Sequence, residues 1–313
     1  MSADGWVVSV DGGGTSTDVL LANTSLETAY LKSGEGTNPN VYGADGIDRA
    51  EKLIREVLYE RDVAVENVEI CVMGMAGISH PKHRPRLEEA CEALFPQASL
   101  LFTSDAELAH RAIWGNGPGM TLIVGTGSIA IGEDKDGKLR RAGGFGFQIG
   151  DVGGGYWFGK SLLTELIVAD RSGDEEVAEL RKRVTDHFGV TSFEEALEKA
   201  SGDESVATVA GLAQEILQLA ESENSIANHI VALGAEGIQE LVEELKEKIG
   251  FSGDLGLHGS VITESKFYRS MLMKRLGFDD WRKADFPAVF GGLITAGAAA
   301  GLEELVKLSV QNG

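Results

Sequence analysis

Residues 7–23 read VVSVDGGGTSTDVLLAN, and this stretch decides the fold. An apolar strand ends on Asp11, passes through glycines 12–14 and continues as a second apolar strand. Because these glycines carry no Cβ atom, their backbone N–H groups can approach a phosphate closely. An ordinary glycine-rich hairpin is the alternative, but three consecutive glycines cost more backbone entropy than a hairpin needs. We therefore interpret the turn as a phosphate-binding loop, in which Thr15 adds a hydroxyl donor and Asp11 can hold the water shell of a metal ion.

Two other phosphate-binding motifs fit less well. A dinucleotide fingerprint needs a third glycine where Thr17 stands, and its turn should open a helix rather than a strand. A P-loop pattern is matched letter for letter by GGYWFGKS at residues 154–161. No apolar strand leads into this match, and three bulky aromatic residues stand where backbone must wrap the phosphate. We interpret the segment as the first turn of an amphipathic helix.

Length, composition and charge are typical of a two-domain enzyme. The chain has 313 residues, of which 43% are hydrophobic, enough for a sizeable core. It shows neither an apolar run of about 20 residues nor an apolar signal core after MSADGW, so we expect a cytoplasmic protein that does not bind membranes. The net charge of −21 argues against nucleic acid as a partner. Cys71 and Cys91 form no C-x-x-C pair and give no metal or disulfide framework.

The order of elements in the first third of the chain predicts a mixed sheet. Hydrophobic patterns predict three strands joined by short turns, followed by helix, strand, helix and strand, at residues 7–10, 18–22, 28–33, 46–60, 68–73, 86–94 and 99–103. This order indicates an antiparallel meander that parallel crossovers extend.

The pattern then partly repeats. A strand at 120–124 ends in GTGS and returns at 129–132, a mostly helical stretch runs from Tyr156 to about Lys248, and a further strand covers 255–258. Residues 287–308 are expected to form strand, turn and helix. Each of the two glycine–threonine turns follows an apolar strand, which indicates a duplicated fold whose halves face each other across a nucleotide cleft. The expected hinge is WGNGPG at 114–119.

In this order the motifs resemble those of the actin/hexokinase/Hsp70-like ATPases and, among them, the N-acetylglucosamine kinases, relatives of the benzoyl-CoA reductase activator-type ATPases. The resemblance covers most of the chain and rests on DGGGTSTD at 11–18, GTN at 36–38, TSDA at 103–106, GTGS at 125–128, GGFG and GDVGGGYW within 143–157, and GSV at 259–261. It implies an α/β fold of two ribonuclease-H-like lobes around a nucleotide cleft. The lobes are expected at 1–114 and 115–313, the second with a helical insertion and a last helix that can dock back on the first.

The resemblance also implies a role for each matched position. The nucleotide side comprises Gly13, Gly14 and Thr15 in the first phosphate loop, Thr126 in the second, and Gly259, Ser260 and Glu264 beside the adenosine. The sugar side comprises Asn38, Asp105, Ser128, Gly144, Phe145, Gly146 and Asp151, with Asp105 also the catalytic base. Asp11 and Val152 stand where many amino-sugar kinases carry Glu, a departure that bears on which sugar is bound.

Simpler roles are open for four of these residues on the sequence alone. Asp105, or Ser104 before it, can be the N-cap of the helix AELAHRAIW, and Asp151 can cap the helix that follows it. Asn38 precedes a proline and can be a turn residue, and Phe145 can belong to the core. The resemblance favours the ligand-binding role for each.

The expected function is transfer of the γ-phosphoryl group of ATP, with Mg²⁺, to the 6-hydroxyl of N-acetylglucosamine. This chemistry needs a phosphate cradle, a metal ion and a carboxylate that takes the hydroxyl proton. The alternatives are a glucosamine or broad-specificity hexose kinase, an ATPase that activates a partner enzyme, and a sugar-sensing regulator with a degenerate site. An activator needs cluster-binding cysteines, for which Cys71 and Cys91 have the wrong spacing, and the intact Asp11, Asp105 and Thr126 argue against a regulator. We expect a homodimer with sugar and ATP as its small-molecule partners.

Overall fold

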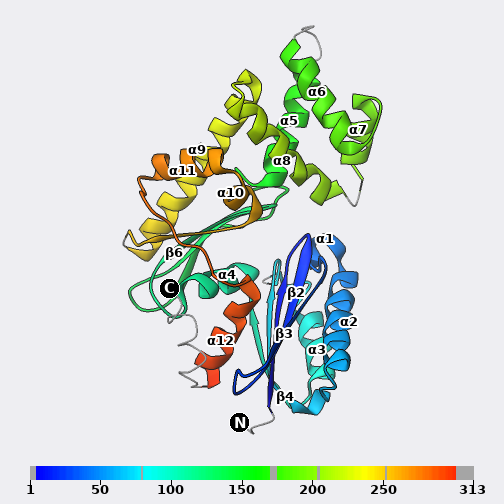
Figure 1. Ribbon diagram of the computed structural model, residues 1–313, viewed down its shortest axis with the longest axis vertical. Coiled ribbons are helices and arrows are strands. Elements are labelled where there is room, and N and C mark those ends of the chain that lie inside the picture. Colours follow the sequence, from blue (N-terminus) through cyan, green and yellow to red (C-terminus); the bar gives the residue numbers. More distant parts are fainter. Residues whose placement is uncertain (1–4, 79, 170–174, 203–204, 251, 301–313) are drawn as a thin grey trace. The chain divides into compact units, whose positions relative to one another are not determined.

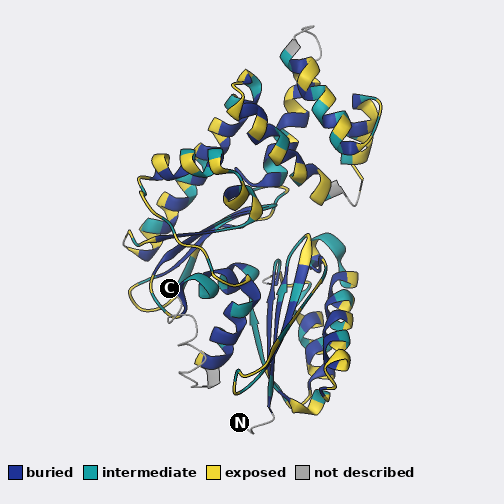
Figure 2. Cartoon of the chain, viewed as in Figure 1, coloured by how far each residue is buried: buried dark blue, intermediate teal, exposed yellow. Residues whose placement is uncertain are grey.

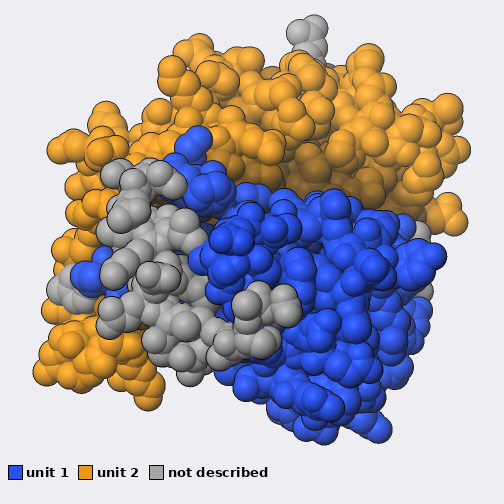
Figure 3. Space-filling model, turned by 60° about the horizontal axis from the view of Figure 1, so that its bottom comes forward, with its two compact units in different colours: residues 1–118, 283–313 blue, residues 119–282 orange. Residues whose placement is uncertain are grey.

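The computed structural model describes residues 5–300 except 79, 170–174, 203–204 and 251, and its elements are labelled in Figure 1. The chain divides into two compact units, residues 1–118 with 283–313 and residues 119–282 (Figure 3). The division expected from the sequence, at 114 and 115, counted the last segment with the second lobe and had its helix dock back on the first. In the structure that helix, α12 (Gly291–Ala300), packs on α4 (Asp105–Trp114) within the first unit.

The first unit contains a five-stranded mixed sheet in the order β3-β2-β1-β4-β5. Its strands are β1 (Trp6–Gly12), β2 (Ser16–Asn23), β3 (Ala29–Glu35), β4 (Val68–Met75) and β5 (Ser99–Thr103). The first three are antiparallel neighbours, and β1, β4 and β5 run parallel. The predicted meander with parallel crossovers is therefore confirmed. Strand β4 is buried along nearly its whole length because helices cover both faces of the sheet.

Helices form a layer on each face of this sheet (Figure 1). On one face lie α2 (Ala44–Glu60) and α3 (Arg84–Leu94), which pack on Val8 and Val10 of β1. On the other face α4 and α12 pack on Val7. Alternate residues of one strand thus belong to two separate cores, as the two-residue period of a strand requires. Figure 2 shows the buried strands between the layers. The short helix α1 (Pro39–Tyr42) and the 3₁₀ turn η1 (Val65–Asn67) complete this part of the chain.

The second unit repeats the pattern in a sheet of order β8-β7-β6-β9. Its strands are β6 (Met120–Val124), β7 (Ser128–Glu133), β8 (Leu139–Gly143) and β9 (Leu255–His258), with β6 antiparallel to β7 and parallel to β9. Strand β8 was not predicted from the sequence. This strand reads LRRAG, and its two arginines break the apolar alternation because it is an edge strand with one flank open.

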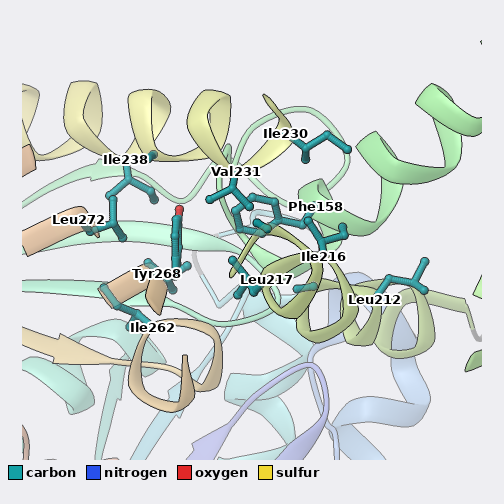
Figure 4. Close-up of a cluster of buried hydrophobic side chains, with 14 of the residues drawn as sticks. Phe158, Leu212, Ile216, Leu217, Ile230, Val231, Ile238, Ile262, Tyr268 and Leu272 are labelled. Atoms are coloured by element: carbon teal, nitrogen blue, oxygen red, sulfur yellow. The ribbon is translucent and has the colours of Figure 1, made fainter. Parts of the chain in front are cut away.

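The helices of the second unit build its core over this sheet (Figure 4). They are α5 (Gly155–Val168), α6 (Glu175–Phe188), α7 (Phe193–Ala200), α8 (Ser205–Glu221), α9 (Ser225–Ile249), α10 (Ser260–Glu264) and α11 (Lys266–Leu276). Phe158, Ile216, Val231 and Tyr268 meet at its centre. The predicted helical stretch is confirmed. None of the described helices is long and apolar enough to cross a membrane.

The strand expected at the start of residues 287–308 is a wrong prediction. Ala288–Phe290 form a 3₁₀ turn (η3), and α12 begins directly after it. Val289 is buried by packing on the face of the first sheet, and its carbonyl oxygen accepts a hydrogen bond of 2.7 Å from the Ser9 hydroxyl. A short apolar run that packs on a sheet has the same pattern as a run that pairs within it. The part of the expected helix beyond residue 300 lies outside the described residues.

Candidate functional site

The glycine turn between β1 and β2 is held by hydrogen bonds from the loop before α1 and from the last residue of α1. The Gly13 N–H donates to the Ser16 carbonyl at 2.9 Å, and the Gly13 carbonyl accepts from the N–H groups of Thr37 and Asn38 at 3.0 Å each. The Tyr42 hydroxyl donates to the Gly14 carbonyl at 3.0 Å. The turn is therefore a preorganised loop at the carboxyl end of β1, the edge at which ligands bind in sheets of this kind.

Gly14 stands in open space within the first unit. A Cβ atom added to Gly12 would lie 2.5 Å from the Thr37 hydroxyl, so packing explains that glycine. A Cβ on Gly14 would meet no protein atom within 4 Å, and its φ lies outside the left-handed region. Neither crowding nor backbone conformation requires glycine at position 14. A turn that keeps room for a phosphate group would require it, and the predicted role of Gly14 fits this geometry. Gly13 differs, because its N–H is engaged by the Ser16 carbonyl and a Cβ there would lie 3.1 Å from that oxygen.

Three carboxylates gather at the same end of this sheet. Asp11 pairs in register with Asp18 on β2, and Asp105 begins α4 directly after β5. Burial raises the pKa of Asp11 well above its usual range, and the negative charges of Asp105 and Asp18 raise it further. A cation beside Asp11 would relieve this repulsion.

The donor set around Asp11 fits Mg²⁺ only with water and phosphate oxygens as further ligands. Among the described residues, no group of three or more His, Cys, Asp or Glu side chains could hold a metal ion. Mg²⁺ dehydrates reluctantly and is commonly bound by one or two carboxylates plus substrate phosphates. The prediction that Asp11 holds the water shell is compatible with this arrangement.

Asp11→Asn is expected to raise the melting temperature of the ligand-free protein at neutral pH. Because the pKa of Asp11 is raised by folding, the ionised carboxylate destabilises the fold above that pKa, and the penalty disappears as the pH falls below the pKa of the unfolded chain. Asparagine carries no charge, so its advantage should shrink on acidification. Thermal melts without Mg²⁺ at about pH 7.5 and about pH 4 test this. A lower melting temperature at neutral pH would show that a favourable interaction holds the ionised carboxylate in the folded chain.

Asp105 does not cap α4. The cap is Ser104, whose side-chain oxygen accepts a hydrogen bond of 3.2 Å from the Glu107 N–H. Asp105 is the first helical residue, where a negative charge is favoured by the helix dipole. Ser104 therefore caps the helix in place of Asp105, and the role of Asp105 as catalytic base stays a prediction.

Asn38 has a visible structural role. It is the N-cap of α1, and its side-chain oxygen accepts a hydrogen bond of 2.9 Å from the Asn40 N–H. The side-chain oxygen of Asn38 therefore has the role in the turn that the sequence left open. A sugar contact, which stays a prediction, would use the amide nitrogen.

The second glycine turn, between β6 and β7, is joined to the start of α5. The Gly125 and Thr126 carbonyls accept hydrogen bonds from the N–H groups of Gly155 and Tyr156, at 2.7 and 3.0 Å. The amide before them, that of Gly154, donates to the Asp151 carbonyl at 3.0 Å, so protein carbonyls engage the first three amides of the P-loop-like segment. The segment is the start of a helix, as predicted, and Thr126 lies on the turn that its amides support.

Asp151 organises the predicted sugar-side residues of the second unit. Its carboxylate accepts the N–H of Gly146 at 3.3 Å and the backbone N–H groups of Phe145 and Ser128, and these bonds oppose the rise in its pKa caused by burial. The Ser128 hydroxyl donates to the Val152 carbonyl at 2.9 Å. The structure thus brings together Ser128, the turn 144–146 and Asp151. Asp151 does not cap α5, whose N-cap is Gly154.

Phe145 is not a core residue. Its side chain is 72% exposed, on a turn whose glycines Gly144 and Gly146 have φ of 66° and 101°. An aromatic ring in this position can offer an apolar face to a ligand.

The predicted adenosine-side residues follow β9. Gly259 has φ of 92°, and a Cβ on it would lie 2.5 Å from the Val124 carbonyl oxygen, so it lies beside the start of the second glycine turn. Ser260 and Glu264 are the two ends of the short helix α10, and both are exposed.

Two residues near the first glycine turn, Tyr42 and Asp18, were not predicted from the sequence. Tyr42 supports the turn from 28 positions away, a contact that no spacing rule indicates. Asp18 could have been found, because a hairpin closed at glycines 12–14 places it opposite Asp11.

Comparison with known proteins gives one family match and two related kinases. Residues 8–279 match the profile of the BadF/BadG/BcrA/BcrD ATPase family. The chain is 28% identical over 176 residues to an N-acetylmuramic acid/N-acetylglucosamine kinase of Clostridium acetobutylicum, a match that covers 56% of this chain and 58% of that protein, less than two thirds of its length. It is 24% identical over 259 residues to an N-acetyl-D-glucosamine kinase of Dictyostelium discoideum, covering 78% and 80% of the two chains.

A solved structure shows the fold. The Chromobacterium violaceum protein, provisionally named an N-acetylglucosamine kinase, has a TM-score of 0.72 at 18% identity, with 93% of this chain and 98% of that chain covered. At this identity the likeness speaks for the fold alone. The predicted α/β fold of the actin/hexokinase type is confirmed.

Proposed function

The chain belongs to the BadF/BadG/BcrA/BcrD ATPase family, and from this premise we propose that it is an ATP-dependent kinase of N-acetylglucosamine that phosphorylates the 6-hydroxyl. The observation that carries the proposal is that Asp11 and Asp105 lie at the same edge of the first sheet, where the first glycine turn begins. They are close enough for the charge of Asp105 to raise the pKa of Asp11. Phosphoryl transfer to an alcohol needs this combination of phosphate cradle, metal carboxylate and base. The kinase names of two relatives support it.

In the proposed mechanism the residues of this chain position the reactants and move one proton. The N–H group of Gly14 and the Thr15 hydroxyl bind the phosphates, with Thr126 on the second turn, while Gly13 shapes the first loop through the bond from its N–H to the Ser16 carbonyl. Bound Mg²⁺, held through water by Asp11, would supply positive charge to the phosphates. Asp105 takes the 6-hydroxyl proton while the sugar oxygen bonds to the γ-phosphorus and the bond to the ADP oxygen breaks. Gly259, Ser260 and Glu264 bind the adenosine, and Asn38, Ser128, residues 144–146 and Asp151 bind the sugar.

The Asp151 loop favours an N-acetylated sugar. It carries backbone amides and one carboxylate, a set that suits neutral hydroxyl groups and an acetamido group. A free amine at C2 would need a further carboxylate, and the residue after Asp151 is Val152, whose side chain packs against α9. The two named relatives act on N-acetyl sugars.

We expect kcat/KM for N-acetylglucosamine to exceed that for glucosamine tenfold or more, about 1.4 kcal/mol of transition-state binding. Competition between the two sugars at matched low concentration measures this ratio directly. Preferential phosphorylation of glucosamine, or of glucose, would remove the N-acetyl assignment and leave the kinase in place.

An ADP-release assay across a panel of hexoses and amino sugars tests the kinase proposal itself. Release should depend on the acceptor sugar. Hydrolysis at the same rate without sugar would favour the activator-type ATPase. The placement of the thiols speaks against that alternative, because Cys71 and Cys91 are 0% and 4% exposed in the core of the first unit. The homodimer and the cytoplasmic location stay predictions.

A further inference from the structure

The residue after Asp151 packs directly on the backbone of helix α9. A Cβ atom added to Gly237 would lie 2.8 Å from the Val152 Cβ and closer still to its Cγ1. A Cβ added to Gly234 would lie 2.7 Å from the Phe158 ring and 3.3 Å from the Gly153 Cα. We name Gly234 and Gly237 the α9 ledge. Because Gly237 has no side chain, Val152 can lie against the backbone of the helix, and Gly234 admits both the Phe158 ring and Gly153.

The geometry of helix α9 does not itself require glycine at positions 234 and 237. Glycine is a poorer helix former than alanine, and both ledge residues lie in the interior of α9 with φ outside the left-handed region. Val152 is 37% exposed, so its burial alone does not explain a gap that fits it. What the ledge changes is the position of the loop.

The loop joins the ledge to the predicted sugar-binding carboxylate. Asp151 has φ of 55°, a conformation that costs energy in a residue other than glycine and persists only when its surroundings hold it. The next residue is also held, because the Val152 carbonyl accepts a hydrogen bond of 2.9 Å from the Ser128 hydroxyl. Below it, Gly153 lies on Tyr268, whose hydroxyl would be 3.1 Å from a Cβ at position 153 (Figure 4 shows Tyr268 near Ile238 of α9). Tyr268 is 0% exposed and rigidly packed against Phe158.

We propose that the α9 ledge is the positioning element of Asp151: by admitting Val152, Gly237 sets where the Asp151 carboxylate stands and thereby how tightly the acceptor sugar binds. The part that concerns the sugar rests on the proposed function. The part that concerns the loop does not.

The test replaces Gly237 with Ala and relieves the clash by Val152→Gly in a double variant. In Gly237→Ala we expect KM for N-acetylglucosamine to rise about tenfold, while KM for ATP stays within about twofold and kcat within about threefold. Val152→Gly should have a small effect, and the double variant should behave like Val152→Gly, because the atoms that meet the new methyl group are gone. Glu236→Ala, an exposed neighbour on α9, is the matched control and should change nothing.

Amide hydrogen exchange provides a readout that needs no substrate. Exchange in peptides covering residues 144–153 should become faster in Gly237→Ala and return to the Val152→Gly level in the double variant, since the N–H groups held by Asp151 are released when it moves. If no sugar is phosphorylated by the wild type, the proposed function fails while this readout still decides the role of the ledge. Unchanged exchange in Gly237→Ala, an equal effect of Glu236→Ala, or a double variant as impaired as Gly237→Ala would overturn the proposal. Should Gly237→Ala fail to fold, folding of the double variant supports the ledge and its failure overturns it.

Discussion

Asp105→Asn is expected to lower kcat by roughly 10²–10⁴-fold, the range for loss of a positioned general base. Asparagine matches the carboxylate in shape but cannot take the proton of the sugar hydroxyl. The expected loss falls on kcat, and binding of ATP and sugar should stay nearly unchanged. Steady-state kinetics with N-acetylglucosamine and saturating ATP measure it.

A thermal melt of the same variant separates catalysis from folding. Ser104 caps α4, so the amide at position 105 should leave the melting temperature nearly unchanged or slightly higher, since one of the charges facing Asp11 is gone. Ser104→Ala is the matched control, because it should lose about 1 kcal/mol of stability as a missing cap and keep most of the turnover. Retention of more than half of wild-type kcat by Asp105→Asn would exclude Asp105 as the base.

Gly14→Val is expected to abolish measurable binding of ATP. The N–H groups of the turn approach the phosphates only where no side chain intervenes, and the valine would occupy that space. Because a Cβ at position 14 meets no protein atom within 4 Å, the substitution should leave the fold intact. Titration calorimetry with a non-hydrolysable ATP analogue measures the loss, and a thermal melt checks the fold.

Lys160→Ala is the comparison that tests the assignment of the phosphate loop. Lys160 is exposed on α5, and the amides at the start of that helix bond to the carbonyls of the second glycine turn. Its removal should change ATP affinity by less than about threefold, under ~1 kcal/mol. Loss of nucleotide by Lys160→Ala together with retention by Gly14→Val would make the P-loop pattern the true site.

The fold was predictable wherever a local pattern decides the structure. Strands such as β1 and β4 are short, mostly apolar runs, and α2 has one apolar face, so the hydrophobic pattern identifies each. The failures have one cause. The edge strand β8 and the 3₁₀ turn η3 take their conformation from the surface they pack against, and residues 139–143 and 288–290 carry no periodic signal of their own.

The ligand-binding roles of the candidate-site residues stay predictions, but the places of several of them in the fold could be read from the sequence. Glycine turns are recognisable in a sequence because glycine lets the backbone approach a ligand closely. Asp11 and Asp105 follow strands that the hydrophobic pattern predicts. Whether a polar residue caps a helix or faces a ligand depends on which donors come within hydrogen-bond reach. That information was absent from the spacing at Asp105 and Asp151.

The sequence thus specified the meander and parallel crossovers of the first unit, the two glycine turns and the family, because backbone freedom and hydrophobic period act between near neighbours along the chain. Tertiary structure alone decided that Tyr42 supports the turn at Gly14 and that Ala288–Phe290 pack on the first sheet as a 3₁₀ turn. It also decided that Val152 rests on α9. These contacts join residues that lie up to 280 positions apart, as between Ser9 and Val289, and short-range forces act on such pairs only after the chain has brought them together.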